Sequence, residues 1–320
     1  MRLKEITIEI TQQCPNCCVH CSSMSSTTKP SFLPVEIIER VIDDAVELGC
    51  QTVSLSGGEP FMYHDLLRLV NIIKERNLYI QIYTSGICMV GNEPVSIPLV
   101  VLKELHGKVD KYIVNCEASD EVTYNRLMGT SFHGFEKMQE FVRNVVAMGE
   151  TVEAHFVPMK LNYKQIPEVV DLCAKLGVSR ISFLRLVKQG RCMANSDQII
   201  MGDSEQQQVY SLINECRNQK KIEVRTGIPL QKCVNRINCL TGSVKMVVRY
   251  DGNVYPCEAF KNDQPDHIAH ASADNVKNFR LADIYRESQY LNEVRKWLES
   301  FQEIDTCETC LAQYLSTKKY

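Results

Sequence analysis

Three cysteines near the N-terminus, Cys14, Cys18 and Cys21, follow the spacing CxxxCxxC. A four-iron cluster is usually held by four cysteine thiolates. Three thiolates therefore leave one iron without a protein ligand and free to bind another molecule. The alternative is a structural zinc site, which usually needs four ligands in pairs, and no CxxC or HxxxH pair follows within the next few dozen residues. The spacing favours an iron–sulfur cluster with one open position.

A second group of cysteines lies in the last third of the chain. It consists of Cys233, Cys239 and Cys257, followed by Cys307 and Cys310 in a CxxC spacing. Four thiolates can hold either a second iron–sulfur cluster or a structural zinc ion. The sequence therefore predicts a second metal site, with one more cysteine than such a site needs.

Strand-like and helix-like stretches alternate along the first two thirds of the chain. Ile6, Ile8 and Ile10 alternate with polar residues in the first strand, and the helices carry apolar residues at helical spacing. Strands that alternate with helices imply a parallel sheet with right-handed crossovers. Six strands are expected at residues 4–11, 51–56, 78–84, 111–116, 151–157 and 180–186, and six main helices at residues 34–48, 63–75, 97–106, 135–148, 166–176 and 204–218. The fold class is α/β, and periodicity alone does not separate a barrel from a doubly wound sheet.

Polar residues or glycines follow most of these strands, at the positions where barrel-type folds place their sites. The second strand ends in Gly57-Gly58-Glu59, and two glycines let the backbone approach a ligand closely. Ser85, Glu117 and Arg185 lie at or near the ends of the third, fourth and sixth strands. We expect these side chains to meet at one edge of the sheet.

The pattern changes from about residue 221. Residues 243–249 and 253–255 flank Asp251-Gly252, a dipeptide typical of hairpin turns, and two helices are expected at residues 281–287 and 290–299. The sequence therefore predicts two domains. The first is a barrel core over residues 1–220, and the second is a small hairpin-plus-helix metal domain over residues 221–320.

The composition argues against several classes of protein. With a net charge of −3 and no basic block, the chain is not expected to bind nucleic acid or anionic membranes. No apolar run is long enough to span a bilayer, and the N-terminus does not resemble a signal peptide. Fifteen cysteines in a chain without an export signal are typical of metal or redox chemistry in a reducing compartment. We expect a cytoplasmic metalloenzyme.

The CxxxCxxC motif and Gly57-Gly58-Glu59, which follows it at a strand end, together resemble the signature of the radical SAM superfamily. The resemblance implies a partial (β/α)6 TIM-like barrel and a [4Fe-4S] cluster bound by Cys14, Cys18 and Cys21. S-adenosyl-L-methionine (SAM) would bind the open iron, and a flavodoxin- or ferredoxin-type donor would reduce the cluster. Reductive cleavage of SAM would yield a 5′-deoxyadenosyl radical that takes a hydrogen atom from a substrate carbon.

The resemblance also implies which residues bind SAM. Gly57-Gly58-Glu59 would receive the α-ammonium group, and Ser85 would reach the ribose or the carboxylate. Arg185 would bind the SAM carboxylate with two hydrogen bonds, with a buried structural ion pair as the alternative. Glu117 would bind the ribose hydroxyls, in a segment that departs from the family's Ser-x-Asp-like pattern, and His20 would pack near the adenine.

The C-terminal region resembles the SPASM and twitch domains of the same superfamily. Cys239 and Cys257, with a glycine between them, match the spacing of a cysteine–glycine–cysteine element of these domains. No cysteine follows Cys310, and this truncation favours a twitch domain with one auxiliary [4Fe-4S] cluster. Its ligands would be Cys239, Cys257, Cys307 and Cys310, and Cys233 could replace one of them.

Two residues are candidates for direct roles in the reaction. Glu258 follows Cys257 and could take the proton released on oxidation, with an exposed turn acid as the alternative. Cys116, at the end of a strand, could donate a hydrogen atom to a substrate radical. Cys88 and Cys192 could do the same, although buried cysteines usually serve packing alone.

The resemblance favours oxidative modification of a peptide or protein side chain. SPASM and twitch relatives most often act on peptides, and an auxiliary cluster could accept an electron from the substrate radical. A radical dehydrogenase or epimerase of small molecules, of the aminocyclitol or sugar type, is one alternative. A non-catalytic iron–sulfur or zinc scaffold is another, but Glu59, Arg185 and the open three-cysteine site argue against it.

Anaerobic reconstitution should load two four-iron clusters, about eight irons per chain, because two separate sets of cysteines are present. Replacing Cys14, Cys18 and Cys21 together by Ala should leave about four irons, those of the second site. Iron and acid-labile sulfide analysis measure both. Stoichiometric zinc without cluster absorbance, in protein purified without oxygen, would contradict this prediction.

Overall fold

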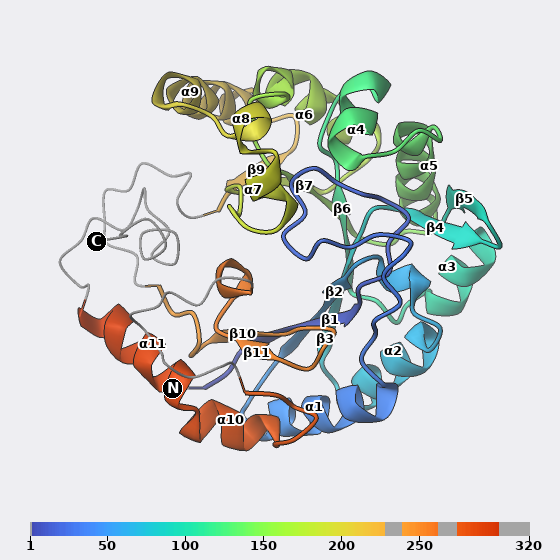
Figure 1. Cartoon of the computed structure of the whole chain (residues 1–320). Helices are drawn as coiled ribbons and strands as arrows, with labels where there is room; N and C mark the ends of the chain where they lie inside the picture. The colour runs from blue at the N-terminus through green and yellow to red at the C-terminus, as the bar shows by residue number, and fades with distance from the viewer. Residues whose placement is uncertain (1, 228–238, 262–273, 301–320) are drawn as a thin grey trace.

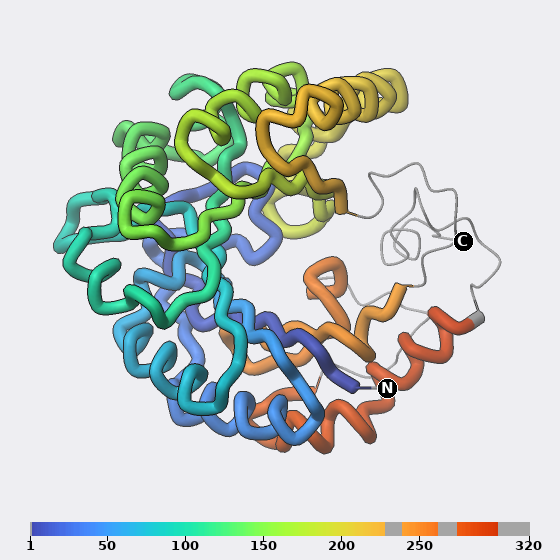
Figure 2. The backbone as a smooth tube through the Cα atoms, turned by 180° about the vertical axis from the view of Figure 1, so that it is seen from behind, coloured from blue at the N-terminus to red at the C-terminus, as the bar shows by residue number. Residues whose placement is uncertain are grey.

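The computed structural model describes residues 2–227, 239–261 and 274–300. In this part of the chain nine strands form one curved sheet, and helices cover its outer face (Figure 1). Seen from behind, the backbone forms an open ring with the helices on the outside (Figure 2). Among the described residues, we find no helix of the length and apolar character that a membrane span requires.

The sheet has the strand order β11-β10-β1-β2-β3-β6-β7-β8-β9, and every neighbouring pair is parallel except β10 with β11. The strands are β1 (Glu5–Thr11), β2 (Thr52–Gly57), β3 (Tyr79–Thr84), β6 (Lys111–Asn115), β7 (Val152–Phe156), β8 (Arg180–Phe183), β9 (Glu223–Thr226), β10 (Lys245–Val248) and β11 (Val254–Tyr255). A separate hairpin, β4 (Ile87–Val90) with β5 (Glu93–Ser96), follows β3. The edge strands β9 and β11 do not pair with each other, so the described sheet is an open barrel. The predicted fold class is confirmed.

Most helices lie between strands along the chain, and the last two follow β11. The helices are α1 (Val35–Glu47), α2 (Leu66–Glu75), α3 (Leu99–Leu105), α4 (Glu121–Met128), α5 (Gly134–Ala147), α6 (Ile166–Lys175), α7 (Arg191–Ala194), α8 (Ser196–Ile199), α9 (Asp203–Gln219), α10 (Leu281–Glu287) and α11 (Gln289–Ser300), with short 3-10 turns η1 (Pro60–Met62), η2 (Tyr163–Gln165) and η3 (Glu258–Phe260). The six main helices expected from the sequence correspond to α1, α2, α3, α5, α6 and α9. The short helix α4 was not expected, and its first turn is capped by Asp120, which accepts a hydrogen bond from the Thr123 amide.

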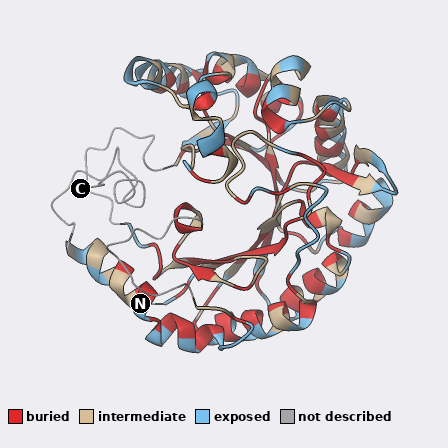
Figure 3. Ribbon diagram, in the orientation of Figure 1, coloured by how far each residue is buried: buried red, intermediate tan, exposed pale blue. Residues whose placement is uncertain are grey.

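The strands separate apolar side chains from polar ones. In β1, Ile6, Ile8 and Ile10 are fully buried in the core beneath the helices, whereas Thr7 and Glu9 line the interior of the barrel. Figure 3 shows the buried residues on the sheet and on the helix faces that are turned toward it. A closed TIM barrel fills its interior with branched apolar side chains. The interior of this open barrel is instead lined by polar side chains and holds two cavities that can receive a ligand.

Three strands from beyond residue 220, β9, β10 and β11, belong to the barrel sheet. β9 continues the sheet past β8, and β10 pairs in parallel with β1, with Ile6 opposite Met246. The hairpin of β10 and β11 was expected from the sequence, but its attachment to β1 was not. Segments on both sides of the predicted boundary thus share one sheet, and the division into residues 1–220 and 221–320 remains a prediction.

Because the apolar face of β1 supports the helices, Ile8→Ala should lower the free energy of unfolding by about 2–5 kcal/mol, the usual cost of a cavity in a core. Thr7→Ala, on the interior face of the same strand, removes one hydrogen bond to Glu258 and should cost only about 1 kcal/mol. Urea unfolding of the two variants measures the difference. Equal losses would contradict the assignment of the two faces.

Candidate active site

Two adjoining cavities lie on the inner face of the sheet. The first, here named the loop cavity, has a volume of about 270 Å³ and is lined by the cysteine loop and by the carboxyl ends of β2, β3, β6 and β7. The second, the lumen cavity, has a volume of about 480 Å³ and is lined mainly by side chains of β1, β3, β6, β7, β9 and β10. The residues that line both cavities are Ser56, Tyr83, His155, Leu184, Arg185 and Val187.

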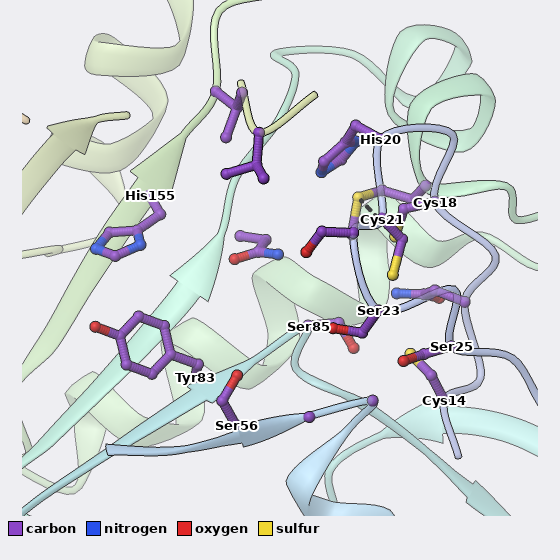
Figure 4. A pocket seen from close by; sticks show the side chains of 18 of the residues that line it. Cys14, Cys18, His20, Cys21, Ser23, Ser25, Ser56, Tyr83, Ser85 and His155 are labelled. Carbon is purple, nitrogen blue, oxygen red and sulfur yellow. Dashed lines mark hydrogen bonds between the residues drawn. The ribbon is translucent and has the colours of Figure 1, made fainter. Parts of the chain in front are cut away.

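The three predicted cluster ligands lie together in the loop cavity. Cys14, Cys18 and Cys21 occupy one side of it, and His155 and Tyr83 lie on the other (Figure 4). Burial raises the pKa of the Cys14 and Cys18 thiols, so their thiolates need a positive partner in this place. Iron supplies that charge, because thiolates that bind a metal are deprotonated. The three thiols therefore fit a [4Fe-4S] cluster with three protein ligands, which would leave one iron free to bind another molecule.

Contacts from distant parts of the chain hold the cysteine loop. The amide of Cys17 donates to the carbonyl of Met128 at the end of α4, at 3.1 Å. Arg191, at the start of α7, donates to the carbonyl of Cys18 at 2.8 Å and to that of Ser25 at 2.7 Å. Sequence reasoning did not assign a role to Arg191. Two of its guanidinium nitrogens, Nε and Nη2, hold the loop.

Gly57 and Gly58 lie against the backbone that leads into the cysteine loop. The amide of Gly58 donates to the carbonyl of Thr11 at 2.6 Å, and the amide of Glu59 donates to that of Gln13 at 2.8 Å. A Cβ atom at Gly58 would lie only 2.0 Å from the Gln13 carbonyl oxygen, so no larger residue fits. The glycines thus pack the loop, in addition to the ligand contact that the sequence predicts.

Glu59 is fully buried in the loop cavity. Its carboxylate accepts hydrogen bonds from Thr84 Oγ1 (2.7 Å), from the amide and hydroxyl of Ser85 (2.8 and 2.7 Å) and from the Phe61 amide (3.3 Å). Burial raises its pKa to about 7, although these hydrogen bonds favour the ionised form. The structure therefore brings Glu59 and Ser85 together, with a carboxylate that a cationic ligand would stabilise.

Glu117 and His20 face each other in the same cavity. Glu117 Oε2 accepts a hydrogen bond from the Val157 amide at 2.8 Å, and Oε1 lies 3.7 Å from His20 Nε2. Burial raises the pKa of Glu117 to about 8 and lowers that of His20 to about 4. Near neutral pH the pair is therefore mostly uncharged. Both residues line the loop cavity, and their contacts with the ribose and adenine stay predictions.

Arg185 lies between the two cavities and lines both. Its Nη1 atom is buried and has no hydrogen-bond acceptor within the described residues. A buried guanidinium nitrogen without an acceptor is costly, so a ligand oxygen is the expected partner. This geometry argues against the alternative of a structural ion pair.

Glu258 lines the lumen cavity and not the loop cavity. Its carboxylate lies 3.4 Å from Lys245 Nζ and accepts a hydrogen bond from Thr7 Oγ1 at 3.3 Å. Burial alone would raise its pKa, but Lys245 and Lys261 outweigh that effect and hold the pKa at about 2. A carboxylate that ionises so readily is a weak base at neutral pH, so the geometry gives little support to the predicted catalytic role.

The structure does not bring Cys116 to either cavity. Successive side chains of a strand point to opposite faces, and here Asn115 lines the loop cavity while Cys116 is buried against Cys173 of α6. The predicted hydrogen-atom donor Cys116 therefore faces α6, and its neighbour Asn115 is the residue that faces the cavity. Cys88 and Cys192 are buried as well, and neither lines the two cavities.

The second cysteine set is only partly covered by the structure. Cys239 is exposed and Cys257 is half-buried. Cys233, Cys307 and Cys310 lie outside the described residues. The ligand set of the auxiliary cluster therefore stays a prediction.

Sequence reasoning missed a buried ion pair beside the loop cavity. Lys261 Nζ contacts Glu9 of β1 and the hydroxyl of Ser23 at 3.0 Å, and Ser23 also donates to Glu9 at 2.6 Å. All three side chains are less than a tenth exposed. The inward position of Glu9 in the alternating β1 was a usable signal, but nothing in the sequence points to Lys261. Lys261 thus joins the segment that follows Cys257 to β1 and to the loop that follows Cys21.

The fold and the three-cysteine cavity define a radical SAM enzyme. Residues 8–173, more than half of the chain, match the Radical SAM superfamily, and the chain belongs to it. Residues 239–311 match the SPASM family, described as an iron-sulfur cluster-binding domain. The recognition made from the sequence is thus confirmed, together with the [4Fe-4S] and SAM cofactors. The match to SPASM ends at residue 311, directly after Cys310, and the narrower assignment to a twitch domain stays a prediction.

Known proteins resemble the chain over nearly its whole length. The PqqA peptide cyclase of Gluconobacter oxydans is 25% identical over 307 residues, which cover 94% of this chain and 81% of the relative. The crystal structure of Streptococcus suis SuiB bound to its precursor peptide SuiA superposes with a TM-score of 0.73 at 18% identity, over 92% of this chain and 67% of that one. Native anSMEcpe with bound AdoMet gives a TM-score of 0.71 at 14% identity, over 98% and 88%. These structures confirm the fold.

We expect the affinity for SAM to fall as the pH is lowered from 8 to 6. The ionised fraction of Glu59, whose pKa is about 7, drops by about tenfold over this range, and the SAM ammonium prefers the carboxylate. Since Glu117 also titrates, with a pKa of about 8, the comparison is made in a Glu117→Gln background. Adding Glu59→Gln should weaken binding and flatten the pH profile, whereas Ser85→Ala should shift its midpoint upward. If the SAM affinity changes with pH equally in the presence and absence of the Glu59 carboxylate, the predicted contact between Glu59 and the SAM ammonium is disproved.

Lys261→Met should lower the free energy of unfolding by about 3–5 kcal/mol, because it leaves the Glu9 carboxylate buried without its partner. Glu9→Gln combined with Lys261→Met should cost less than the sum of the two single changes. Lys103→Met, on the exposed surface of α3, serves as the control and should stay within about 0.5 kcal/mol. Urea unfolding measures all four variants, and additive losses would contradict a coupled pair.

Proposed function

We propose that this radical SAM enzyme oxidatively modifies a side chain of a peptide or protein. The observation that carries the proposal is the lumen cavity, which opens directly onto the cavity of the cluster and SAM residues and shares six lining residues with it. A substrate group held there would lie next to SAM. The similarity to the PqqA peptide cyclase, which covers 94% of this chain, supports a peptide as the substrate.

Within this proposal the residues of the loop cavity bind the cofactors. Cys14, Cys18 and Cys21 hold the cluster, and Gly57-Gly58-Glu59 with Ser85 receives the SAM ammonium. Glu117 and His20 lie at the ribose and adenine, and Arg185 binds the carboxylate. When bound, the cluster and SAM together supply a radical that removes a hydrogen atom from a substrate carbon. The protein orients the substrate and excludes water.

The residues shared by both cavities line the boundary between them, where a hydrogen atom would pass from the substrate to the radical formed from SAM. Tyr83 and His155 lie there with their ring centroids 5.4 Å apart. Burial lowers the pKa of His155 to about 3 and raises that of Tyr83 to about 12. Both rings are therefore uncharged near neutral pH, and they can orient a substrate by packing and hydrogen bonding without taking up a proton.

We propose an oxidative outcome because the chain carries a SPASM domain as well as the first cluster site. A second cluster would accept the electron that the substrate radical loses, while a proton leaves to water or to a base. An external one-electron donor of the flavodoxin or ferredoxin type, needed for the first cluster, remains part of the proposal.

The reduced, reconstituted enzyme should cleave SAM slowly to 5′-deoxyadenosine without substrate, and faster with a peptide that it modifies. With such a peptide, the reaction is run in deuterated water and the product is weighed. Loss of two hydrogens supports oxidation. An unchanged composition with one solvent deuterium bound to carbon would mean epimerisation and would overturn the oxidative outcome, and stimulation only by small sugars or aminocyclitols would overturn the peptide substrate.

A further inference from the structure

Most charges that line the lumen cavity are paired. Lys111 Nζ lies 3.2 Å from Glu153, and Lys245 Nζ lies 3.2 Å from Glu5 and 3.4 Å from Glu258. These contacts use all three carboxylates that line the cavity. The remaining charged side chains of its lining, Arg185 and Arg225, are both cations.

Neither arginine has a carboxylate partner within the described part of the chain. Arg185 Nη1 is buried without an acceptor. Arg225 belongs to a cross-strand row, Asn115, His155, Ser182 and Arg225, that runs over β6, β7, β8 and β9. Asn115 and His155 of that row line the cavities, so Arg225 faces the same interior. Its positive charge acts on both Tyr83 and His155.

Both guanidinium groups can bind an anion, and SAM provides only one carboxylate. Arg185 lines both cavities and is the residue within reach of SAM, whereas Arg225 lines the lumen cavity alone. The neighbours of Arg225 do not neutralise it, because His155 and Tyr83 are uncharged and the carboxylates of the cavity are held by lysines. Arg225 is exposed, so its guanidinium is solvated without a ligand and is free to bind an anion with two parallel hydrogen bonds.

We propose that the lumen cavity binds a carboxylate of the substrate peptide at Arg225 and thereby places the neighbouring C–H bond beside Tyr83 and His155. The carboxylate belongs either to an Asp or Glu side chain close to the modified residue or to the C-terminus of the peptide. The proposal names the substrate chemistry of the site described under the proposed function and rests on that function.

The test uses the reconstituted enzyme with SAM, without oxygen, and a pool of short synthetic peptides. One third of the pool carries internal Asp or Glu with an amidated C-terminus, one third carries only a free C-terminal carboxylate, and one third has neither. Bound peptides are identified by mass spectrometry. We expect one of the two carboxylate classes to be enriched, and the enriched class identifies the source of the anion.

Arg225→Gln should reduce this enrichment by about tenfold or more, the usual effect of losing a hydrogen bond to a charged group. Its iron content and affinity for SAM should stay unchanged, which shows that the variant is folded. Arg225→Lys keeps the charge but loses the planar fork, and should retain part of the enrichment. Arg143→Gln, on the exposed surface of α5, changes the net charge equally and should have no effect.

A second measurement separates the two proposals. Phenylglyoxal labels accessible arginines, and N-acetylglutamate amide should protect Arg225 from it better than N-acetylglutamine amide does. The anion site is overturned if peptides bind without any preference for a carboxylate, or if such a preference persists in Arg225→Gln. Either result leaves the proposed peptide function standing. Protection by the small acid without binding of any peptide overturns the peptide function and leaves the anion site standing. If no peptide binds and the small acid gives no protection, both proposals are overturned.

Discussion

The placement of the cysteine loop is the constraint on which the rest of the site depends. The loop leaves β1 and is positioned by contacts at which two backbones touch without room for a side chain. A Cβ atom at Gly58 would lie 2.0 Å from the Gln13 carbonyl oxygen, and one at Gly190 would lie 2.5 Å from that of Ser22. Arg191 adds hydrogen bonds to two further carbonyls of the loop. These contacts come from the end of β2 and from the start of α7, so the three thiols converge only where the folded barrel brings these segments to the loop.

The polar interior imposes a second requirement, since buried charges are costly unless they are paired. The chain meets it by drawing its C-terminal segment against β1. β10 pairs with β1 in parallel, Lys245 contacts Glu5, and Lys261 contacts Glu9. The alternate inward positions of β1 thus receive cations from the SPASM region. The same contacts place that region beside both cavities, so the segment that extends the sheet past β1 also carries Cys257.

Local patterns predicted a large part of this arrangement. Alternation located the six central strands, and the spacing of Cys14, Cys18 and Cys21 identified the first cluster site before any contact was known. Long-range pairing was not predictable, because a parallel neighbour for β1 and an ion pair between residues 252 positions apart leave no local trace. The expectation that Cys116 faces the cavity was wrong for a different reason. Its position at a strand end was recognised, but whether it or Asn115 faces inward is a matter of register, which a single residue decides.

The ionisable groups that a ligand can affect differ between the two cavities. In the loop cavity they include two buried carboxyl groups, because burial raises the pKa of Glu59 to about 7 and that of Glu117 to about 8. In the lumen cavity they are guanidinium groups, Arg185 at the boundary and Arg225 beyond it. SAM carries an ammonium and a sulfonium, and its binding would stabilise the carboxylates as anions. Binding of SAM would in turn leave positive charge facing the lumen cavity, where a carboxylate of the substrate is favoured. The order of the charges thus matches the order in which the two molecules must lie for a hydrogen atom to pass between them.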